Sequence, residues 1–377
     1  MRNLVLSWLL IISALFSGQP AAAQNGVIPT MGTEFWVGFM ENYAGGNEQI
    51  RLFISSYHNT SGTVSMPLTG YSQNFTVMAN TVTTVSLPGT AVTYGSETVG
   101  DRSILVQAAD TIAVFALNFA NATADAAAIF PIKTLGTEYR VHCYKGLDSD
   151  NASEFMIVST KDGTEVEITP TALTAGGRPA GVPFIVNLDS AETYQVKAAS
   201  GNGDLTGSLV RGTDVSGSCR PFAVFSGAKC TNIPTGCTAC DHLYEQALPV
   251  PGWGKRYFTV PWSGPNSYTY RVMANTNGTV YTVDGVAQAM LNAGQFAEVN
   301  YATGAKVIES SVPISVAQFI QGQTCSGNVG DPALLVLNSI DQRISNISFA
   351  TVVSSNISSQ FIAVVVETAS TAQVVLD

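Results

Sequence analysis

The residues best suited to chemistry lie in one stretch, CTNIPTGCTACDHLYEQALP (230–249). It holds Cys230, Cys237, Cys240 and His242, and thiolates with an imidazole can bind zinc tetrahedrally. A zinc ribbon also needs a second Cys-x2-Cys pair, and the sequence contains none. We therefore expect no metal here, and no cofactor elsewhere in the chain.

Redox chemistry at Cys237-Thr-Ala-Cys240 is a second interpretation of the same stretch. A reactive thiolate is usually stabilised by a helix N-terminus or a nearby cation, within a βαβ context. This chain shows no sustained apolar spacing of the helical kind, so that context is not expected. Structural disulfides are the favoured interpretation.

The beginning of the chain supports disulfides. MRNLVLSWLLIISALFSGQPAAAQ has one Arg, an apolar run from Leu4 to Phe16 and a small-residue tract that ends at Ala23. This order is typical of a secretory signal peptide, here residues 1–23. It predicts a secreted or cell-surface protein in an oxidising compartment, where cysteines pair. No later stretch has 18 uncharged apolar residues, so no membrane span is expected.

Six cysteines allow 15 pairings, which sequence alone cannot resolve. The expected pairing joins Cys230 to Cys237 or Cys240, and the third of these to a more distant cysteine. Such bridges would order a loop that contains Pro234 and Gly236. The disulfide candidates are all six cysteines: Cys143, Cys219, Cys230, Cys237, Cys240 and Cys325.

Catalytic residues are sparse. His58, His142 and His242 are the only imidazoles, and neither G-x-S-x-G nor H-E-x-x-H occurs. Asp241-His242 could form a triad with a serine, but adjacent residues of a strand point to opposite faces. We therefore expect no catalytic residues and no enzyme activity. A hydrolase whose residues converge only in three dimensions is the remaining catalytic alternative.

The charge balance excludes one class of partner. The net charge is -10, with 17 Lys and Arg against 27 Asp and Glu, and no basic cluster is present. Nucleic-acid binding depends on neutralising phosphates with basic side chains. The chain is therefore not expected to bind nucleic acid.

The surrounding elements read as strands that repeat. Alternating apolar runs flank Gly-containing turns at 59–64, 161–166 and 275–280, and this pattern is typical of hairpins. The repeats predict an all-β fold of tandem antiparallel β-sandwich-like units of about 100 residues. A propeller-like arrangement of the repeats is the alternative.

The pattern also predicts boundaries. The expected units are residues 30–130, 131–245 with the Cys-rich loop, 250–340, and a partial fourth unit at 341–377. The last would hold only a hairpin, which is marginally stable by itself in water. It must pack on earlier units, or the natural chain continues past Asp377.

Four stretches resemble the IgGFc-binding protein N-terminal domain family: GTEFWVGFMENY (32–43), SGNGDLTGSLV (200–210), the Cys-rich stretch from 224 to 258, and GDPALLVLNSIDQ (330–342). The resemblance implies a secreted, non-catalytic binding or adhesion module for glycoprotein or other cell-surface partners. The short leader suits a bacterial member. A structural spacer of a cell-surface array is the alternative from another class.

Overall fold

The computed structural model describes residues 29–43, 45–213, 219–344 and 362–375. These residues form 23 strands and six short 3-10 helices, with no α-helix among them. The ladders between named strands are antiparallel. The prediction of an all-β, sandwich-like architecture is confirmed. The expected signal peptide, 1–23, lies outside the described residues.

Unit 1 is a two-layer structure organised around one long strand. The N-terminal half of that strand, β7, pairs with β1 and β3, and its C-terminal half pairs with β2 and β8. Strands β4 and β5 form the two edges. The strands are β1 (Gly32–Val37), β2 (Gln49–Ser56), β3 (Thr60–Met66), β4 (Tyr71–Val77), β5 (Thr81–Leu87), β7 (Ile104–Ala120) and β8 (Thr123–Ile129).

Unit 3 repeats this topology strand for strand. Its long strand β22 pairs with β17 and β19 through its first half and with β18 and β23 through its second. Both sheets therefore have the same strand order. The strands are β17 (Gly254–Thr259), β18 (Tyr268–Ala274), β19 (Tyr281–Val283), β20 (Val286–Ala287), β21 (Phe296–Ala302), β22 (Lys306–Ile320) and β23 (Ala333–Val336).

Unit 2 differs because two separate strands replace the long one. Strand β14 pairs with β9 and β11, whereas β15 pairs with β10 and β16 in another sheet. Strand β13 pairs with β10 on one side and with β6 (Val99–Gly100) of unit 1 on the other, so β6 forms the edge of this sheet. The strands are β9 (Glu138–Arg140), β10 (Ser153–Ser159), β11 (Thr164–Thr169), β12 (Phe184–Leu188), β13 (Thr193–Lys197), β14 (Leu209–Gly212), β15 (Phe222–Thr231) and β16 (Asp241–Gln246).

The Gly-containing turns are not hairpins, which corrects the prediction from sequence. Strands β2 and β3 do not pair with each other but lie in opposite layers, each against β7. The same holds for β10 with β11 in unit 2 and for β18 with β19 in unit 3. The local pattern looks like a hairpin because an arch between layers also joins two alternating strands through a tight turn.

The expected fourth unit is not formed by the part of 341–377 that the structure describes. Residues 362–375 contain the 3-10 helix η6 (Thr368–Gln373) and no strand. Exposed valines, including Val364 and Val375, cover no neighbouring sheet. An isolated strand pair has too little apolar area to be stable without such a sheet. Residues 345–361 and 376–377 lie outside the described part.

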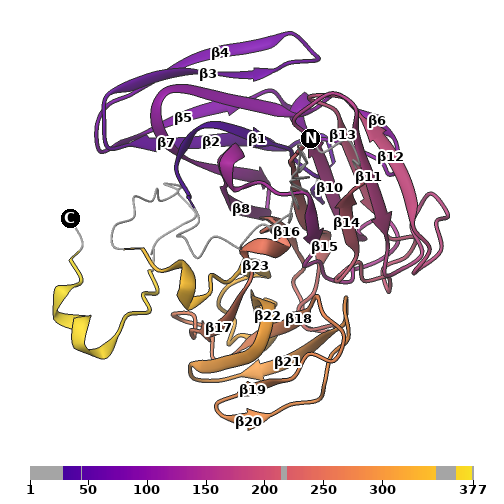
Figure 1. The fold of residues 1–377 in the computed structure, drawn as a ribbon, viewed down its shortest axis with the longest axis vertical. Coiled ribbons are helices and arrows are strands. Elements are labelled where there is room, and N and C mark those ends of the chain that lie inside the picture. Colours follow the sequence, from indigo (N-terminus) through magenta and orange to yellow (C-terminus); the bar gives the residue numbers. More distant parts are fainter. Residues whose placement is uncertain (1–28, 44, 214–218, 345–361, 376–377) are drawn as a thin grey trace, which may run out of the picture.

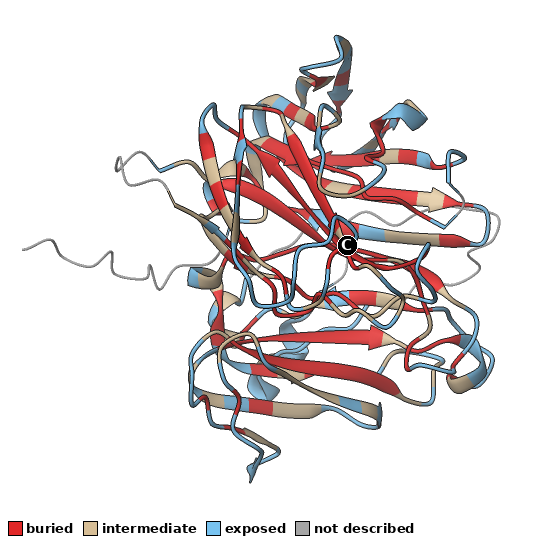
Figure 2. Ribbon diagram, turned by 90° about the vertical axis from the view of Figure 1, so that its right-hand side faces the viewer, coloured by how far each residue is buried: buried red, intermediate tan, exposed pale blue. Residues whose placement is uncertain are grey.

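In the view of Figure 1, unit 1 lies at the upper left, unit 2 at the right and unit 3 at the bottom. Their strands carry the buried residues (Figure 2). One apolar core is continuous from unit 1 into unit 2, because Met156, Val158, Phe225 and Tyr244 pack with the residues of unit 1. Unit 3 has its own core, and a smaller cluster around Tyr144 and Phe319 joins it to unit 2.

Candidate functional site

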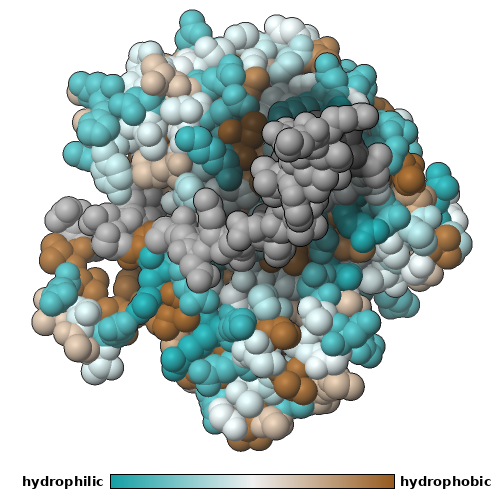
Figure 3. All heavy atoms as spheres, viewed as in Figure 1, coloured by the Kyte–Doolittle hydropathy of each residue, from teal (hydrophilic) through white to brown (hydrophobic). Residues whose placement is uncertain are grey.

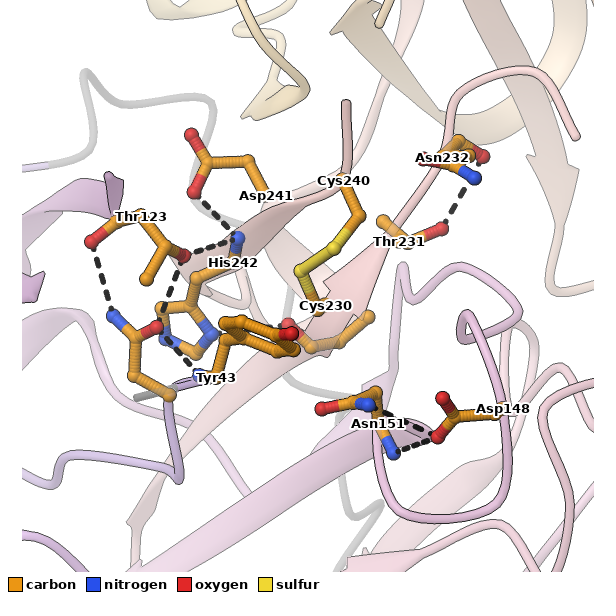
Figure 4. The surroundings of a disulfide bond; sticks show 12 residues. Tyr43, Thr123, Asp148, Asn151, Cys230, Thr231, Asn232, Cys240, Asp241 and His242 are labelled. Carbon is orange, nitrogen blue, oxygen red and sulfur yellow. Dashed lines mark hydrogen bonds between the residues drawn. A yellow bond between two sulfur atoms is a disulfide. The ribbon is translucent and has the colours of Figure 1, made fainter. Parts of the chain in front are cut away.

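The Cys-rich loop is cross-linked twice. Cys230, at the end of β15, is bonded to Cys240, just before β16 (Figure 4). Cys237 is bonded to Cys325, in the 3-10 helix η4 (Gln323–Cys325) of unit 3. In both bridges the Cα atoms are 5.5 Å apart. This arrangement is one of those that the sequence left open, and it attaches the loop both to itself and to unit 3.

Backbone contacts reinforce the link between the loop and unit 3. The Gly322 N–H donates to the Ile233 carbonyl at 2.7 Å, and the Thr324 N–H donates to the Thr238 carbonyl at 2.7 Å. A Cβ atom on Gly322 would lie 2.1 Å from the Cys237 carbonyl oxygen, so only glycine permits this approach. The Cys-rich loop is thus a structural connection between units 2 and 3.

Cys143 and Cys219 form no disulfide in the structure, which corrects two of the six candidates. Cys143 is fully buried in the apolar core of unit 2, and its Sγ lies 3.3 Å from the Glu154 carbonyl oxygen. Burial raises the pKa of this thiol, which keeps it protonated and unreactive. Cys219 is exposed, next to residues 214–218 that the structure does not describe.

Asp241 and His242 do not form a catalytic dyad. The Asp241 carboxylate accepts the backbone N–H groups of Ala124 and His242, at 2.8 and 2.7 Å (Figure 4). The imidazole lies on the opposite face of β16 and is fully buried. Its Nδ1 faces the Ala228 carbonyl at 3.0 Å, so Nδ1 carries the proton and Nε2 accepts from the Asn118 amide.

The imidazole is part of a buried hydrogen-bond network between units 1 and 2. Asn118, which reaches His242 at 3.2 Å, also donates to the Met40 carbonyl and accepts from Asn42. The Thr123 hydroxyl donates to Asn42 Oδ1 at 3.0 Å and accepts the backbone N–H of His242 at 3.1 Å. Burial lowers the pKa of His242 to about 4. The ring therefore stays neutral at physiological pH and acts as a structural hydrogen-bonding group.

Carboxyl groups from all three units meet near β16. Burial, with the nearby Asp331 charge, raises the pKa of Asp241 to about 7. Burial also raises the pKa values of Glu245 and of Asp125, whose Oδ2 accepts N–H groups from units 2 and 3. Within the described residues, no group of three or more His, Cys, Asp or Glu side chains could hold a metal ion. The arrangement joins the units without forming a metal centre.

The contact between units 2 and 3 is centred on one buried arginine. Arg271, on β18, is 2% exposed and pairs with Asp204 of unit 2 at 2.9 Å and with Glu298 at 2.7 Å. Its guanidinium also donates to the Cys143 carbonyl at 2.8 Å and stacks 4.0 Å above the ring of Tyr144. Charge pairing, hydrogen bonds and stacking offset the cost of burying this cation.

The same contact holds a histidine–serine pair that sequence reasoning missed. His142 Nε2 lies 2.9 Å from Ser315 Oγ, although the two residues are 173 positions apart. Both side chains are almost fully buried, and the Nδ1 atom of His142 has no hydrogen-bond partner in the part of the chain that the structure describes. Burial and the Arg271 charge lower the pKa of His142 to about 3. Without an orienting carboxylate and access for a substrate, this pair does not form a hydrolytic triad.

The contact between units 1 and 2 carries a different ion network. Glu41 of unit 1 pairs with Lys197 and Lys229 of unit 2, each at 3.0 Å. Burial raises the pKa of Glu41, but the Gly95 N–H and the two ammonium groups outweigh burial and lower it. Among the described residues, the carboxyl oxygens of the fully buried Glu154 nearby have no hydrogen-bond partner. Burial and the Glu41 charge raise its pKa well above the ordinary value.

The two best-defined grooves on the surface of the described residues are both wide open to solvent. One, of about 470 Å³, runs between units 2 and 3 beside the buried Arg271, and its walls come from both units. The other, of about 450 Å³, lies in unit 1 between the start of β3 and the end of β4. The walls of the first groove are Thr171, Asp204 and Thr206 on one side and Leu291, Gly294, Gln295 and Phe296 on the other.

Comparison with known proteins finds similarity over most of the chain. A family profile described as IgGFc binding protein matches residues 125–377, from within β8 to the end of the chain. The human IgGFc-binding protein is 28% identical over 315 residues, which cover 81% of this chain but only 6% of that protein. No solved structure matches. Among the described residues, no helix is long and apolar enough to cross a membrane.

Proposed function

The chain belongs to the IgGFc-binding protein family, and from this we propose that it is an extracellular, non-catalytic module that binds a glycoprotein or another cell-surface protein. The curated human relative is named for binding IgG Fc. This chain spans a small fraction of that protein. Binding to IgG Fc is therefore one of the candidate interactions tested below.

One observation carries the non-catalytic part of the proposal. His142 and His242 are buried between units, where they bond to neighbouring units, and neither lines either groove. Of the residues lining the two grooves, only Asp204 and Asp110 carry a carboxyl group, one in each groove, and none is a histidine, lysine or cysteine. A nucleophile, a base and an orienting group therefore do not converge in either groove.

The extracellular part is supported by the cross-links. A disulfide with a sequence separation of 88 connects two units, and such bridges persist in oxidising compartments. The leader expected at residues 1–23 would deliver the chain there. We propose that the units at 30–130, 131–245 and 250–340 serve as one cross-linked scaffold that presents its surface to a partner.

The surface suits a polar partner. On the face shown in Figure 3, hydrophobic residues occur in small groups among hydrophilic ones. Individual apolar side chains of unit 3 are also exposed, among them Val280, which precedes β19, and Met290. Small dispersed apolar contacts within a polar surface are typical of wet, non-obligate interfaces.

The proposal can be tested with the mature chain, residues 24–377, produced in an oxidising compartment. It would be passed over immobilised IgG Fc, mucin and serum albumin, with heat-unfolded chain as the control for non-specific adhesion. We expect saturable binding to mucin or Fc and none to albumin. Saturation of neither surface would contradict the proposal and favour a spacer. Hydrolysis of a panel of ester, peptide or glycoside substrates that is lost in His142→Ala would show an enzyme.

A further inference from the structure

We propose that the groove between units 2 and 3 is a binding site for a neutral saccharide, such as a glycan carried by a protein partner. The inference rests on the proposed function, because it assigns a ligand class to one place on that binding module. Sites of this kind lie preferentially where two domains meet, in hollows of about 300–1,000 Å³. The groove lies between two units and has a volume of about 470 Å³, although it is shallow and wide open to solvent.

The groove is held in shape by the buried Arg271. Its guanidinium binds the Asp204 carboxylate at 2.9 Å on one wall and stacks 4.4 Å from the Phe296 ring on the other. Asp204 also accepts the Thr206 N–H at 2.9 Å. A carboxylate and an aromatic ring fixed in advance lose little conformational entropy when a ligand binds.

The close approach of the two walls limits one end of the groove. A Cβ atom on Gly207 would lie 2.0 Å from the Gly294 carbonyl oxygen, so two glycine backbones touch there. The Arg140 guanidinium donates to the Gly207 carbonyl at 2.8 Å and to Asn275 of unit 3 at 2.5 Å. The relative position of the walls is therefore set by direct bonds between the units.

The charge of the lining favours a neutral ligand. No Lys or Arg is among the lining residues, so a phosphate or sulfate would meet the Asp204 carboxylate without a cation of its own. The Asp204 charge is already offset by Arg271, and this pairing lowers its pKa against the opposing effect of burial. A free cation would therefore find little uncompensated negative charge in the groove.

The polar groups of the groove that keep free hydrogen-bonding capacity can bind the hydroxyls of a sugar. The Gln295 side-chain oxygen accepts the Asn292 N–H at 2.8 Å, which leaves its amide NH₂ without a partner among the described residues. Asp204 keeps unused lone pairs, because each carboxylate oxygen has one protein bond. A donor and an acceptor beside the apolar surfaces of Phe296 and Leu291 fit a sugar ring, which has hydroxyls at its edge and C–H groups on its face.

The test compares two matched substitutions in unit 3. Gln295→Trp fills the exposed mouth of the groove, whereas Gln288→Trp makes the same change at an exposed position outside the lining. Each variant and the parent would be titrated against immobilised mucin and against the same mucin after periodate oxidation. We expect Gln295→Trp and periodate each to weaken binding at least tenfold, about 1.4 kcal/mol, and Gln288→Trp to have no effect.

A second variant and a direct measurement of sugar binding test the site independently of the Trp substitution. Gln295→Ala removes the amide without adding bulk, and we expect severalfold weaker binding with an unchanged circular-dichroism spectrum. Saturation-transfer NMR with free monosaccharides should show contacts for the parent that Gln295→Trp abolishes. If mucin binds equally to parent and Gln295→Trp, or equally after periodate, the saccharide site is wrong while the binding function stands. If the parent binds neither mucin nor free sugars, the site is wrong, and the Fc arm then decides the proposed function.

Discussion

The two contacts between units are built differently. Units 1 and 2 share one apolar core, in which Phe39 and Tyr244 stack with ring centroids 5.5 Å apart. Units 2 and 3 meet through a smaller apolar cluster, supplemented by the Arg271 charge network and by the Cys237–Cys325 bridge. The smaller apolar contact between units 2 and 3 is therefore stabilised further by charge pairing and by a disulfide, whereas burial of apolar area is the main contribution between units 1 and 2.

The difference also concerns specificity. A shared core tolerates small changes in the angle between units, because dispersion and burial are not directional. The Arg271 guanidinium requires its carbonyl and carboxylate partners at defined positions. The Glu41 ion pairs and the His242–Asn118 hydrogen bond add directional contacts between units 1 and 2 as well. The saccharide groove proposed above depends on the contact between units 2 and 3.

Removing the central charge should break the contact between units 2 and 3. In Arg271→Leu, Asp204 and Glu298 lose their partner, and we expect a loss of about 3–5 kcal/mol in the free energy of unfolding. Urea denaturation, with native-state hydrogen exchange of β18 and β22, would measure it. Arg256→Ala is the control, because its pair with Glu309 is exposed and worth about 0–1 kcal/mol. Equal losses in both variants would contradict the role given to Arg271.

Removing the covalent link should have the next largest effect. Cys237→Ser with Cys325→Ser opens a loop of separation 88, whereas Cys230→Ser with Cys240→Ser opens one of separation 10. Chain entropy predicts losses of up to roughly 4.6 and 2.7 kcal/mol, and observed values usually fall below such limits. Denaturation without reductant would compare the two. A larger loss for the short loop would show that local strain or packing, not the link between units, dominates.

A cavity in the shared core should affect units 1 and 2 together. Met156, on β10, is fully buried and faces unit 1, where a Cβ on Gly38 would lie 2.4 Å from its Cε. We expect Met156→Ala to cost about 2 kcal/mol or more, with lower hydrogen-exchange protection in both β7 and β10. The exposed Met290→Ala should change stability by less than about 0.5 kcal/mol. Loss of protection in unit 2 alone would argue against one shared core.

The smallest effect should appear as a dependence on pH. Asp241 has a raised folded pKa of about 7, so its stabilising contribution is present below the unfolded pKa and lost as pH rises through 7. His242 has a lowered folded pKa of about 4 and contributes the opposite slope, with stability lost as pH falls from about 6.5. These slopes partly cancel between pH 4 and 6.5.

The Asp241→Asn substitution separates the two slopes. The amide oxygen can still accept the N–H groups of Ala124 and His242, while the charge is removed. We expect the variant to match the parent at pH 4 and to exceed its stability at pH 8 by about 1 kcal/mol or more, measured by urea denaturation. Asp101→Asn, at an exposed pair with Arg102, should leave the profile unchanged. A variant less stable than the parent at pH 8 would contradict the raised pKa.

Several features followed from the sequence because they depend on local patterns. Alternating apolar residues predicted strands, and the spacing of the repeats predicted equivalent units. The sheets built around β7 and β22 have the same strand order. The Gly163 and Gly278 turns have φ values of +64° and +73°, a conformation that favours glycine. Gly62 is different: it lies inside β3, where a Cβ would be 2.1 Å from the Gln107 carbonyl.

Other features were decided only by the tertiary structure. Alternation records which residues are buried, but not which strand lies beside which, so the arches between layers looked like hairpins. The partners of Arg271 and His142 lie far along the chain, and the core position of Cys143 kept it away from other cysteines. Which strands pair depends on the total apolar area that is buried when the layers and units pack against one another. A short segment of sequence does not determine that area.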